Sequence, residues 1–139
     1  MSELLTYRGV VYPWQCDHMG HMNVMWYMSK FDEAAWNVFA EIGVTQAYIK
    51  ASSRGMAAVQ INISYKRELM AGETIDIGTR MLEVRDKLIR FSHEMRTAGE
   101  TAAIAELTAV HLDRAARKSC TFEPGIRAKA DALLAQTAA

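Results

Sequence analysis

The chain has 139 residues, of which half are hydrophobic and 23% are charged, and its 16 basic residues balance its 16 acidic residues. This length fits one domain with a buried core, and a zero net charge argues against a general binder of nucleic acids or acidic membranes, since both usually carry excess basic charge. No segment resembles a signal peptide, and no apolar run approaches the roughly 20 residues of a membrane span. We therefore expect one domain, residues 1–139, in the cytoplasm, with Cys16 and Cys120 as free thiols.

The first predicted elements are a strand and a long helix. Residues 4–12 are rich in aliphatic and aromatic side chains and predict a strand, which a loop at 13–22 follows. From residue 23 to residue 42, apolar side chains recur at intervals of three and four, which predicts a helix that is apolar around most of its circumference. Asn23 is its expected N-cap, and Gly43 its expected C′ residue. A narrow polar stripe on this helix consists of Lys30, Glu33, Asn37 and Glu41.

After a loop around residues 50–55, the hydrophobic period changes to two, which is typical of strands. In the first strand, Val59 and Ile61 are expected to face the same side. Short connections interpreted as hairpins separate the strands, so an antiparallel meander of four strands is predicted. A short helix over 124–136 ends the chain, with Pro124 near its start. The four predicted strands cover residues 57–65, 73–84, 87–97 and 101–114.

This order of elements predicts an α+β fold. A helix that is apolar on most sides needs cover from several directions, and a curved antiparallel sheet wrapped around it provides that cover. Such a sheet around a long central helix is the hotdog fold. The alternative is a helix lying on a flat sheet, which is disfavoured because that helix would show a wider polar face.

The sequence CDHMGHMN places polar side chains immediately before the apolar helix. Taken singly, Asp17 is explained as the cap of a turn and Asn23 as an N-cap. Asp17, His18 and His21 are also chemically able to bind a metal, but their spacing on a loop fixes no ligand geometry, and no metal is predicted. A nucleophilic Cys16 is disfavoured because the neighbouring carboxylate opposes thiolate formation.

Taken together, DHMGHMNVMWYMSKFDEA resembles the DxxGHxNNxxY…FEEA signature of hotdog acyl-CoA thioesterases of the 4-hydroxybenzoyl-CoA thioesterase-like group, and the resemblance covers essentially the whole chain. The chain departs from the signature at Val24, where a second Asn is common, and at Ala35, where an Arg is common. The resemblance implies that Asp17 is the catalytic carboxylate, either as nucleophile or as general base for a water. It also implies that a backbone N–H at about Val24 stabilises the oxyanion, and that His21 and Asn23 orient the carboxylate or the water.

A thioesterase also needs an acyl slot and a contact for coenzyme A. Methionines recur every three residues from Met19 to Met28 near two tryptophans, which suits an adaptable apolar wall, although core packing explains them as well. The phosphates of coenzyme A call for basic residues at the mouth of the slot, although these residues are equally explained as solvated strand edges. The expected substrate-binding residues are Trp14, Met25, Tyr27, Lys66, Arg67 and Lys87.

Two other functions remain open. A hotdog dehydratase or hydratase would place a histidine, His93 or His111, opposite an acidic residue such as Glu33. A non-catalytic domain that binds acyl thioesters is the second alternative. The expected partners are an acyl-CoA substrate and further copies of the chain, as a homodimer or homotetramer, because a single hotdog leaves sheet edges unpaired. No nucleic acid, membrane or cofactor is predicted.

Overall fold

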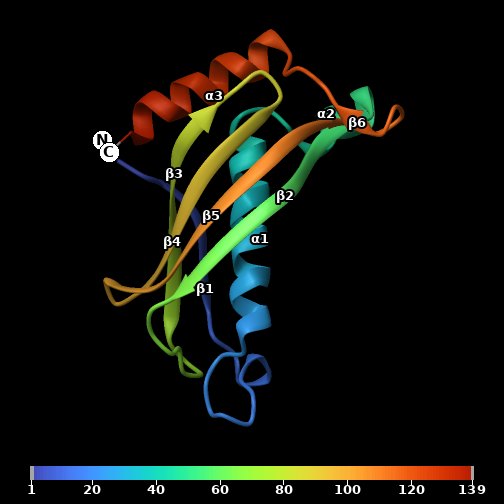
Figure 1. Cartoon of the computed structure of the whole chain (residues 1–139). Helices are drawn as coiled ribbons and strands as arrows, with labels where there is room; N and C mark the ends of the chain where they lie inside the picture. Colours follow the sequence, from blue (N-terminus) through green and yellow to red (C-terminus); the bar gives the residue numbers. More distant parts are fainter. Residues whose placement is uncertain (1, 139) are drawn as a thin grey trace.

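The structure is a computed structural model that describes residues 2–138, and it consists of one curled sheet with three α-helices (Figure 1). No helix within residues 2–138 is long and apolar enough to cross a membrane. The elements in chain order are β1 (Leu4–Val10), a 3₁₀ turn (Pro13–Gln15), α1 (Val24–Glu41), α2 (Gln46–Ser52), β2 (Arg54–Tyr65), β3 (Thr74–Val84), β4 (Leu88–Thr97), β5 (Glu100–Asp113), β6 (Lys118–Ser119) and α3 (Pro124–Thr137).

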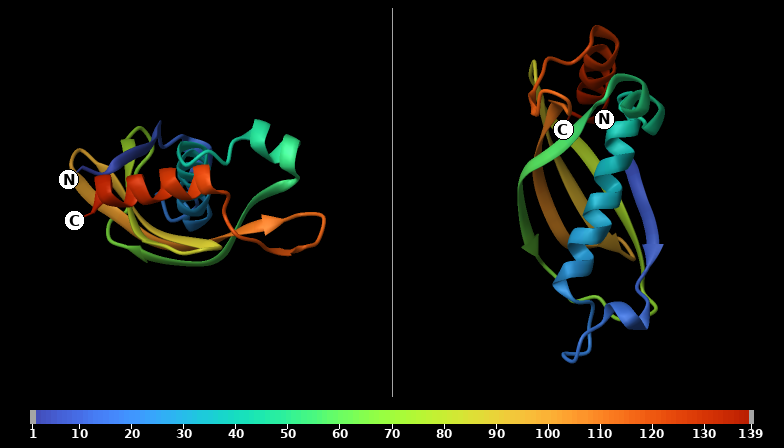
Figure 2. Two further views of the ribbon diagram at one scale, coloured as in Figure 1. Left: turned by 90° about the horizontal axis from the view of Figure 1, so that it is seen from above. Right: turned by 90° about the vertical axis from the view of Figure 1, so that its right-hand side faces the viewer.

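The sheet is antiparallel throughout, with the strand order β1-β3-β4-β5-β2, and β6 pairs with β5. It curls around α1, which lies along its concave side (Figures 1 and 2). The predicted α+β hotdog fold is therefore confirmed. In β4 the side chains alternate, in keeping with the period of two in the sequence, and Ile89, Phe91 and Met95 point inward with no exposed surface.

Helix α1 begins and ends where the sequence predicts. Asn23 is its N-cap, because its side-chain oxygen accepts the Met25 N–H at 3.0 Å. Gly43 has a φ of +103°, a left-handed conformation that glycine adopts without strain, and it ends the helix. Within the helix, Phe31 and Phe39 lie in the core, where Phe39 meets Phe91 edge-on.

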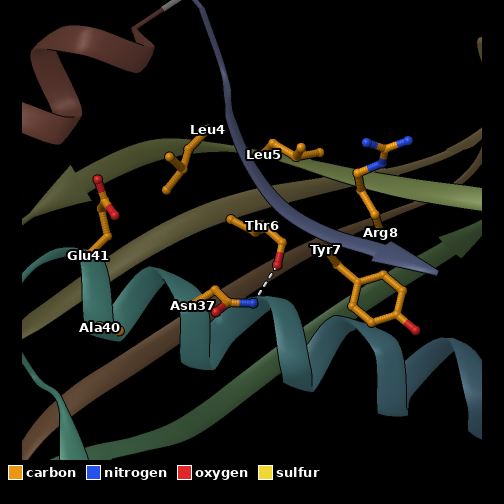
Figure 3. Close-up of a pocket in the computed structure, with 8 residues that line it drawn as sticks. All are labelled: Leu4, Leu5, Thr6, Tyr7, Arg8, Asn37, Ala40 and Glu41. Atoms are coloured by element: carbon orange, nitrogen blue, oxygen red, sulfur yellow. Dashed lines mark hydrogen bonds between the residues drawn. The ribbon is translucent and has the colours of Figure 1, made fainter.

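Two side chains of the polar stripe on α1 face β1 and donate hydrogen bonds to backbone carbonyls of this strand. Lys30 is only 2% exposed, and its Nζ donates to the Tyr7 hydroxyl at 3.3 Å and to the Val10 carbonyl at 3.5 Å. Asn37 donates its side-chain N–H to the Thr6 carbonyl at 2.6 Å (Figure 3). The edge of β1 that faces away from β3 is therefore partly capped by the helix.

The predicted four-stranded meander is wrong in one respect. β3, β4 and β5 follow one another as hairpins, but β2 pairs with β5 and not with β3. The connection over residues 66–73 is therefore no hairpin, and it crosses the end of the sheet near the start of α1. The Met22 N–H donates to the Leu69 carbonyl at 2.7 Å and the Tyr27 hydroxyl to the Arg67 carbonyl at 3.1 Å, so contacts with α1 and its preceding loop hold this crossing.

The region before β2 also differs from the prediction. The loop expected around residues 50–55 is instead the end of α2 and the start of β2. Helix α2 is short, and its N-cap is Thr45, whose side chain accepts the Tyr48 N–H at 3.2 Å. At Val59 the pairing of β2 with β5 shifts register, and this β-bulge leaves Val59 60% exposed instead of facing the side of Ile61. The first strand ends at Val10, two residues earlier than predicted.

Candidate active site

The loop that precedes α1 is closed by backbone hydrogen bonds. The Asp17 N–H donates to the His21 carbonyl at 3.1 Å, and the Gly20 N–H donates to the Asp17 carbonyl at 3.0 Å. Cys16 and Met22 form an isolated antiparallel bridge across the base of the loop. Gly20 has a φ of +90°, which the tight turn requires and glycine adopts at no steric cost. The loop therefore holds Asp17 in a defined position at the start of α1.

The Asp17 carboxylate accepts two hydrogen bonds. The Asn23 side-chain N–H donates to Oδ2 at 2.8 Å, and the Met19 backbone N–H donates to Oδ1 at 2.9 Å. The Asn23 hydrogen bond, then the Met19 hydrogen bond and the nearby His21 and His18 lower the pKa of Asp17 below its ordinary value. Asp17 is therefore a stable carboxylate anion at neutral pH.

Asn23 joins this carboxylate to the first turn of the helix. Its amide nitrogen binds Asp17 while its amide oxygen caps Met25. Among the hydrogen bonds of residues 2–138, none uses the N–H of Val24, the first residue of α1, and Val24 is 56% exposed. A free N–H thus lies at the positive end of the helix dipole, one residue from the group that holds the carboxylate.

A cleft of about 280 Å³ opens beside Val24. Tyr27 forms a buried wall of this cleft, and its ring meets the exposed ring of Tyr65 edge-on at 5.1 Å. Burial raises the pKa of the Tyr27 hydroxyl, which donates to a backbone carbonyl and therefore serves as a fixed wall. The cleft is lined by His21, Met22, Val24, Tyr27, Tyr65, Lys66, Arg67 and Glu68.

The two predicted basic residues of this cleft differ in their surroundings. The Arg67 guanidinium pairs with Glu73 at 2.9 Å and with Glu100 at 3.5 Å. Lys66 is exposed and forms no ion pair within the described part of the chain. Of the two, Lys66 is therefore the one whose charge is left for a ligand.

The His21 ring does not contact the Asp17 carboxylate. Its Nδ1 lies 3.4 Å from the Met22 carbonyl, and its Nε2 lies 3.8 Å from Glu68 Oε1. His21 thus supports the Asp17 loop through its backbone carbonyl, while its ring faces Glu68 in the cleft. Glu68 was not predicted to be a site residue, because it lies in a connection without periodicity.

The remaining predicted residues do not line this cleft. Trp14 stacks on Tyr12 with ring centroids 4.3 Å apart and is 67% exposed, and Met25 is 62% exposed. Both belong to the segment around Asp17. Lys87 lies in the turn between β3 and β4, at the end of the sheet beside α3, whereas the Asp17 loop lies at the opposite end (Figure 1). A single chain does not bring Lys87 to the other site residues.

Within residues 2–138, Glu33 opposes neither of the two alternative histidines. His93 has no exposed surface, its Nδ1 lies 2.7 Å from the Thr79 hydroxyl, and burial lowers its pKa to about 3. His111 is also fully buried, with Nε2 2.9 Å from the Tyr48 hydroxyl. Glu33 is exposed. The pairing of either buried histidine with Glu33 across a pocket, which a dehydratase would need, is therefore unsupported.

No metal centre is formed within residues 2–138, since no three His, Cys, Asp or Glu side chains there are grouped to hold an ion. Cys16 and Cys120 are not joined in a disulfide, as predicted. The Cys120 sulfur lies 3.4 Å from His111 Nδ1, and burial raises the pKa of its thiol. This cysteine is therefore suited to packing and not to nucleophilic attack.

A family model described as the Thioesterase-like superfamily matches residues 11–130. The chain belongs to this superfamily. The resemblance to hotdog thioesterases and the predicted class of enzyme, a thioester hydrolase, are confirmed at the level of this superfamily.

Curated relatives carry thioesterase names. The chain is 29% identical over 121 residues to an L-carnitine dehydrogenase/betainyl-CoA thioesterase of Agrobacterium fabrum, a match that covers 86% of this chain and 25% of that protein. It is 25% identical over 136 residues to a betainyl-CoA thioesterase of Pseudomonas aeruginosa, covering 96% of this chain and 86% of that protein. A Staphylococcus aureus protein solved in complex with CoA has the same fold, with a TM-score of 0.93, 15% identity, and coverage of 100% of this chain and 89% of the other.

Proposed function

We propose that the chain is an acyl-CoA thioesterase that hydrolyses a small or medium acyl-CoA to the free acid and CoA. The observation that supports this most is the position of an ionised carboxylate, Asp17, fixed by Asn23 beside the free N–H of Val24. Thioester hydrolysis needs a group that attacks the carbonyl carbon, or activates a water to do so, and a donor for the oxygen that becomes negative. We propose further that the described elements act as one hotdog domain.

In the proposed reaction, the thioester carbonyl oxygen accepts the Val24 N–H at the helix N-terminus. An oxygen of Asp17 attacks the carbonyl carbon, the C–S bond breaks, and CoA leaves as a thiolate that takes a proton from solvent. Water then cleaves the resulting anhydride and regenerates the carboxylate. In the alternative route, Asp17 acts as general base and a water attacks the carbonyl carbon; the lowered pKa of Asp17 weakens it as a base and as a nucleophile alike.

We also propose that the chain forms a homodimer through β2. The two edges of the sheet differ, since helix α1 caps carbonyls of β1 through Lys30 and Asn37. Helix α2 packs at the start of β2, where Ile49 lies against Gly55, and the rest of this edge exposes a mixture of uncharged polar and apolar side chains. An open edge of this kind is a template for another strand. The exposed residues of β2 are Ala58, Val59, Gln60, Asn62, Ser64 and Tyr65.

The acyl group is proposed to be cationic. Two relatives are named for betainyl-CoA, whose acyl group carries a quaternary ammonium. In this chain the cleft beside Val24 contains the Glu68 carboxylate and the rings of Tyr27 and Tyr65. Carboxylates and aromatic faces are the groups that hold quaternary ammonium ions.

The function is tested by measuring thiol release from a panel of acyl-CoAs of different length and charge. Hydrolysis of at least one member with a kcat/KM of about 10⁴ M⁻¹s⁻¹ or more is expected of an enzyme acting on its own substrate. The same panel separates the alternatives. A hydratase would change the absorbance of an enoyl-CoA without releasing thiol. A binding domain would show acyl-CoA affinity in calorimetry with no turnover, and either result would overturn the proposal.

A further inference from the structure

The connection between β2 and β3 lies at the same end of the molecule as the loop that precedes α1 (Figure 1). We call this connection, residues 66–73, the strap. At its start the Arg67 N–H donates to the Ala102 carbonyl at 3.1 Å, and near its end the Gly72 N–H donates to the Val11 carbonyl at 2.8 Å. The strap is therefore tied to β5 at one end and to the segment after β1 at the other.

Glu73, the last residue of the strap, folds the strap back on itself. Its Oε1 accepts a guanidinium N–H of Arg67 at 2.9 Å, and its Oε2 accepts the Met70 N–H at 2.7 Å. The Met70 N–H, followed by the Arg67 guanidinium, lowers the pKa of the Glu73 carboxyl below its ordinary value, although burial opposes this effect. Glu73 is therefore an anion at neutral pH, and each of its two oxygens holds a different point of the strap.

The closed strap meets the loop that carries Asp17 through Leu69. This residue lies between the two points that Glu73 holds, and its side chain has no exposed surface. Its carbonyl accepts the Met22 N–H at 2.7 Å, and Met22 pairs with Cys16 across the base of the loop. The Leu69 carbonyl therefore supports the base of the loop from below, while the loop positions the carboxylate.

The strap also forms one wall of the cleft beside Val24. Its residues Lys66, Arg67 and Glu68 line this cleft. The Arg67 carbonyl accepts the Tyr27 hydroxyl at 3.1 Å, which joins the wall to α1. A displacement of the strap would move this wall relative to the helix that carries the free N–H. The proposed nucleophile and the cleft thus share one support.

We propose that Glu73 is a positioning residue of the thioesterase reaction. By closing the strap, it keeps the Leu69 carbonyl against the loop and so keeps Asp17 in line with the bound thioester. This inference rests on the proposed function and gives a role to a residue outside the sequence that resembles the family signature. Reaction rates depend steeply on such placement, because a displacement of about 1 Å at the reacting atoms can cost about 10²-fold. Arg67 then serves the closure of the strap and not the binding of CoA.

The first test substitutes the closing carboxylate. Glu73→Gln keeps an oxygen for the Met70 N–H but removes the anionic partner of Arg67, so kcat should fall about tenfold while KM rises by about twofold or less. Glu100→Gln is the matched control, because Glu100 pairs with the same guanidinium at 3.5 Å but lies outside the strap. This control should leave kcat and KM at their wild-type values. A Glu73→Gln variant that melts earlier but has the wild-type kcat while folded would overturn the proposal, since Glu73 would then serve stability alone.

The second test asks whether Arg67 and Glu73 act as one unit. Arg67→Gln should lower kcat to a similar degree as Glu73→Gln, and the double variant should be no slower than the single variants, because all three lose the same contact. Effects that multiply in the double variant would show two independent roles and would contradict the proposal. A tenfold rise of KM in Arg67→Gln with kcat unchanged would also contradict it, because that pattern is expected of a lost contact with CoA.

Hydrogen exchange measures the support of the loop without any substrate. The Met22 N–H, which the Leu69 carbonyl protects, should exchange about tenfold faster in Glu73→Gln than in the wild type or in Glu100→Gln. N–H groups in the middle of β4 report unfolding of the whole domain and should change by a smaller factor. Equal acceleration at Met22 and in β4, or no acceleration at Met22, would reject the proposal. If the wild-type protein hydrolysed no thioester, the proposed function would fail, but this measurement would still decide whether Glu73 supports the loop.

Discussion

Asn23 holds Asp17 and starts helix α1 with the same side chain. Its amide nitrogen lies 2.8 Å from Asp17 Oδ2, and its amide oxygen lies 3.0 Å from the Met25 nitrogen. An aspartate in its place would cap the helix but place two carboxylates together, and a serine would cap the helix but is too short to reach Asp17. Among these three residues, only asparagine both caps the helix and binds Asp17. Asn23 therefore links the proposed nucleophile, Asp17, to the helix that supplies the free N–H.

Substituting Asp17 tests the proposed chemistry directly. Asp17→Asn keeps the shape and removes the charge, so kcat should fall by about 10²–10⁴-fold, the usual contribution of a participating catalytic group. Acyl-CoA should still bind, which titration of the variant with a slow substrate would measure. A folded variant within threefold of wild type would exclude Asp17 as the catalytic residue.

The pH dependence of the rate follows from the same carboxylate. The Asn23 hydrogen bond lowers the pKa of Asp17, so the anion persists below the ordinary range of an aspartate. The wild-type rate should therefore fall only at pH values below that range, as the carboxylate becomes protonated. The residual rate of Asp17→Asn should not show this decrease at acidic pH. A decrease of the wild-type rate that begins near neutral pH would instead indicate a general base with a raised pKa.

Two substitutions of Asn23 separate its roles. Asn23→Ala removes the cap and the contact with Asp17, so it should lower the free energy of unfolding by about 1 kcal/mol and lower kcat more than it raises KM. Asn23→Ser should recover the stability, because serine caps well, but not kcat. Chemical denaturation together with steady-state kinetics would measure both. Recovery of kcat by serine would show that only the cap matters.

The sequence predicted the cap at Asn23 and a strand over the residues of β4 because both depend on local patterns. It did not predict that β2 pairs with β5, since a period of two says that a strand is half-buried but not which strand lies beside it. Glu68 was missed because its place in the cleft depends on how the connection after β2 crosses the sheet end. Lys87 was expected near the site, but a position in the sequence does not tell at which end of the sheet the turn between β3 and β4 lies.

The difference between the two sheet edges predicts the effect of charge on assembly. Val59 lies near the middle of β2 and is 60% exposed, so Val59→Lys would bring two like charges together at the proposed two-fold axis. The variant should become a monomer in light scattering and lose most of its activity. Leu5→Lys places the same charge on β1, where Leu5 is 57% exposed, and should leave the dimer intact. A monomeric wild-type protein, or a dimeric Val59→Lys variant, would contradict assembly through β2.

Buried His93 predicts how stability changes with acid. Burial lowers its pKa from an unfolded value of 6.5 to about 3, so the unfolded chain binds one more proton than the folded chain between these values. The free energy of unfolding should therefore decrease as pH falls below 6.5, by about 1.4 kcal/mol per pH unit from this group alone. His93→Gln keeps a partner for Thr79 and does not titrate, so urea unfolding from pH 7 to pH 4.5 should show a shallower dependence. An equal slope would show that other groups dominate.

The final prediction concerns the charge of the acyl group. Betainyl-CoA and 3,3-dimethylbutyryl-CoA have acyl groups of nearly the same shape, but only the first is cationic. Because Glu68 and Tyr65 line the cleft beside Val24, the cationic substrate should have a kcat/KM about 10-fold or more above its neutral isostere, as expected of a cation held by a carboxylate and an aromatic face. Glu68→Gln should reduce this ratio by lowering only the value for betainyl-CoA, whereas Glu106→Gln, on the exposed surface of β5, should leave it unchanged. Equal rates for the two substrates in the wild-type protein would reject a cationic acyl group while leaving the thioesterase activity itself in place.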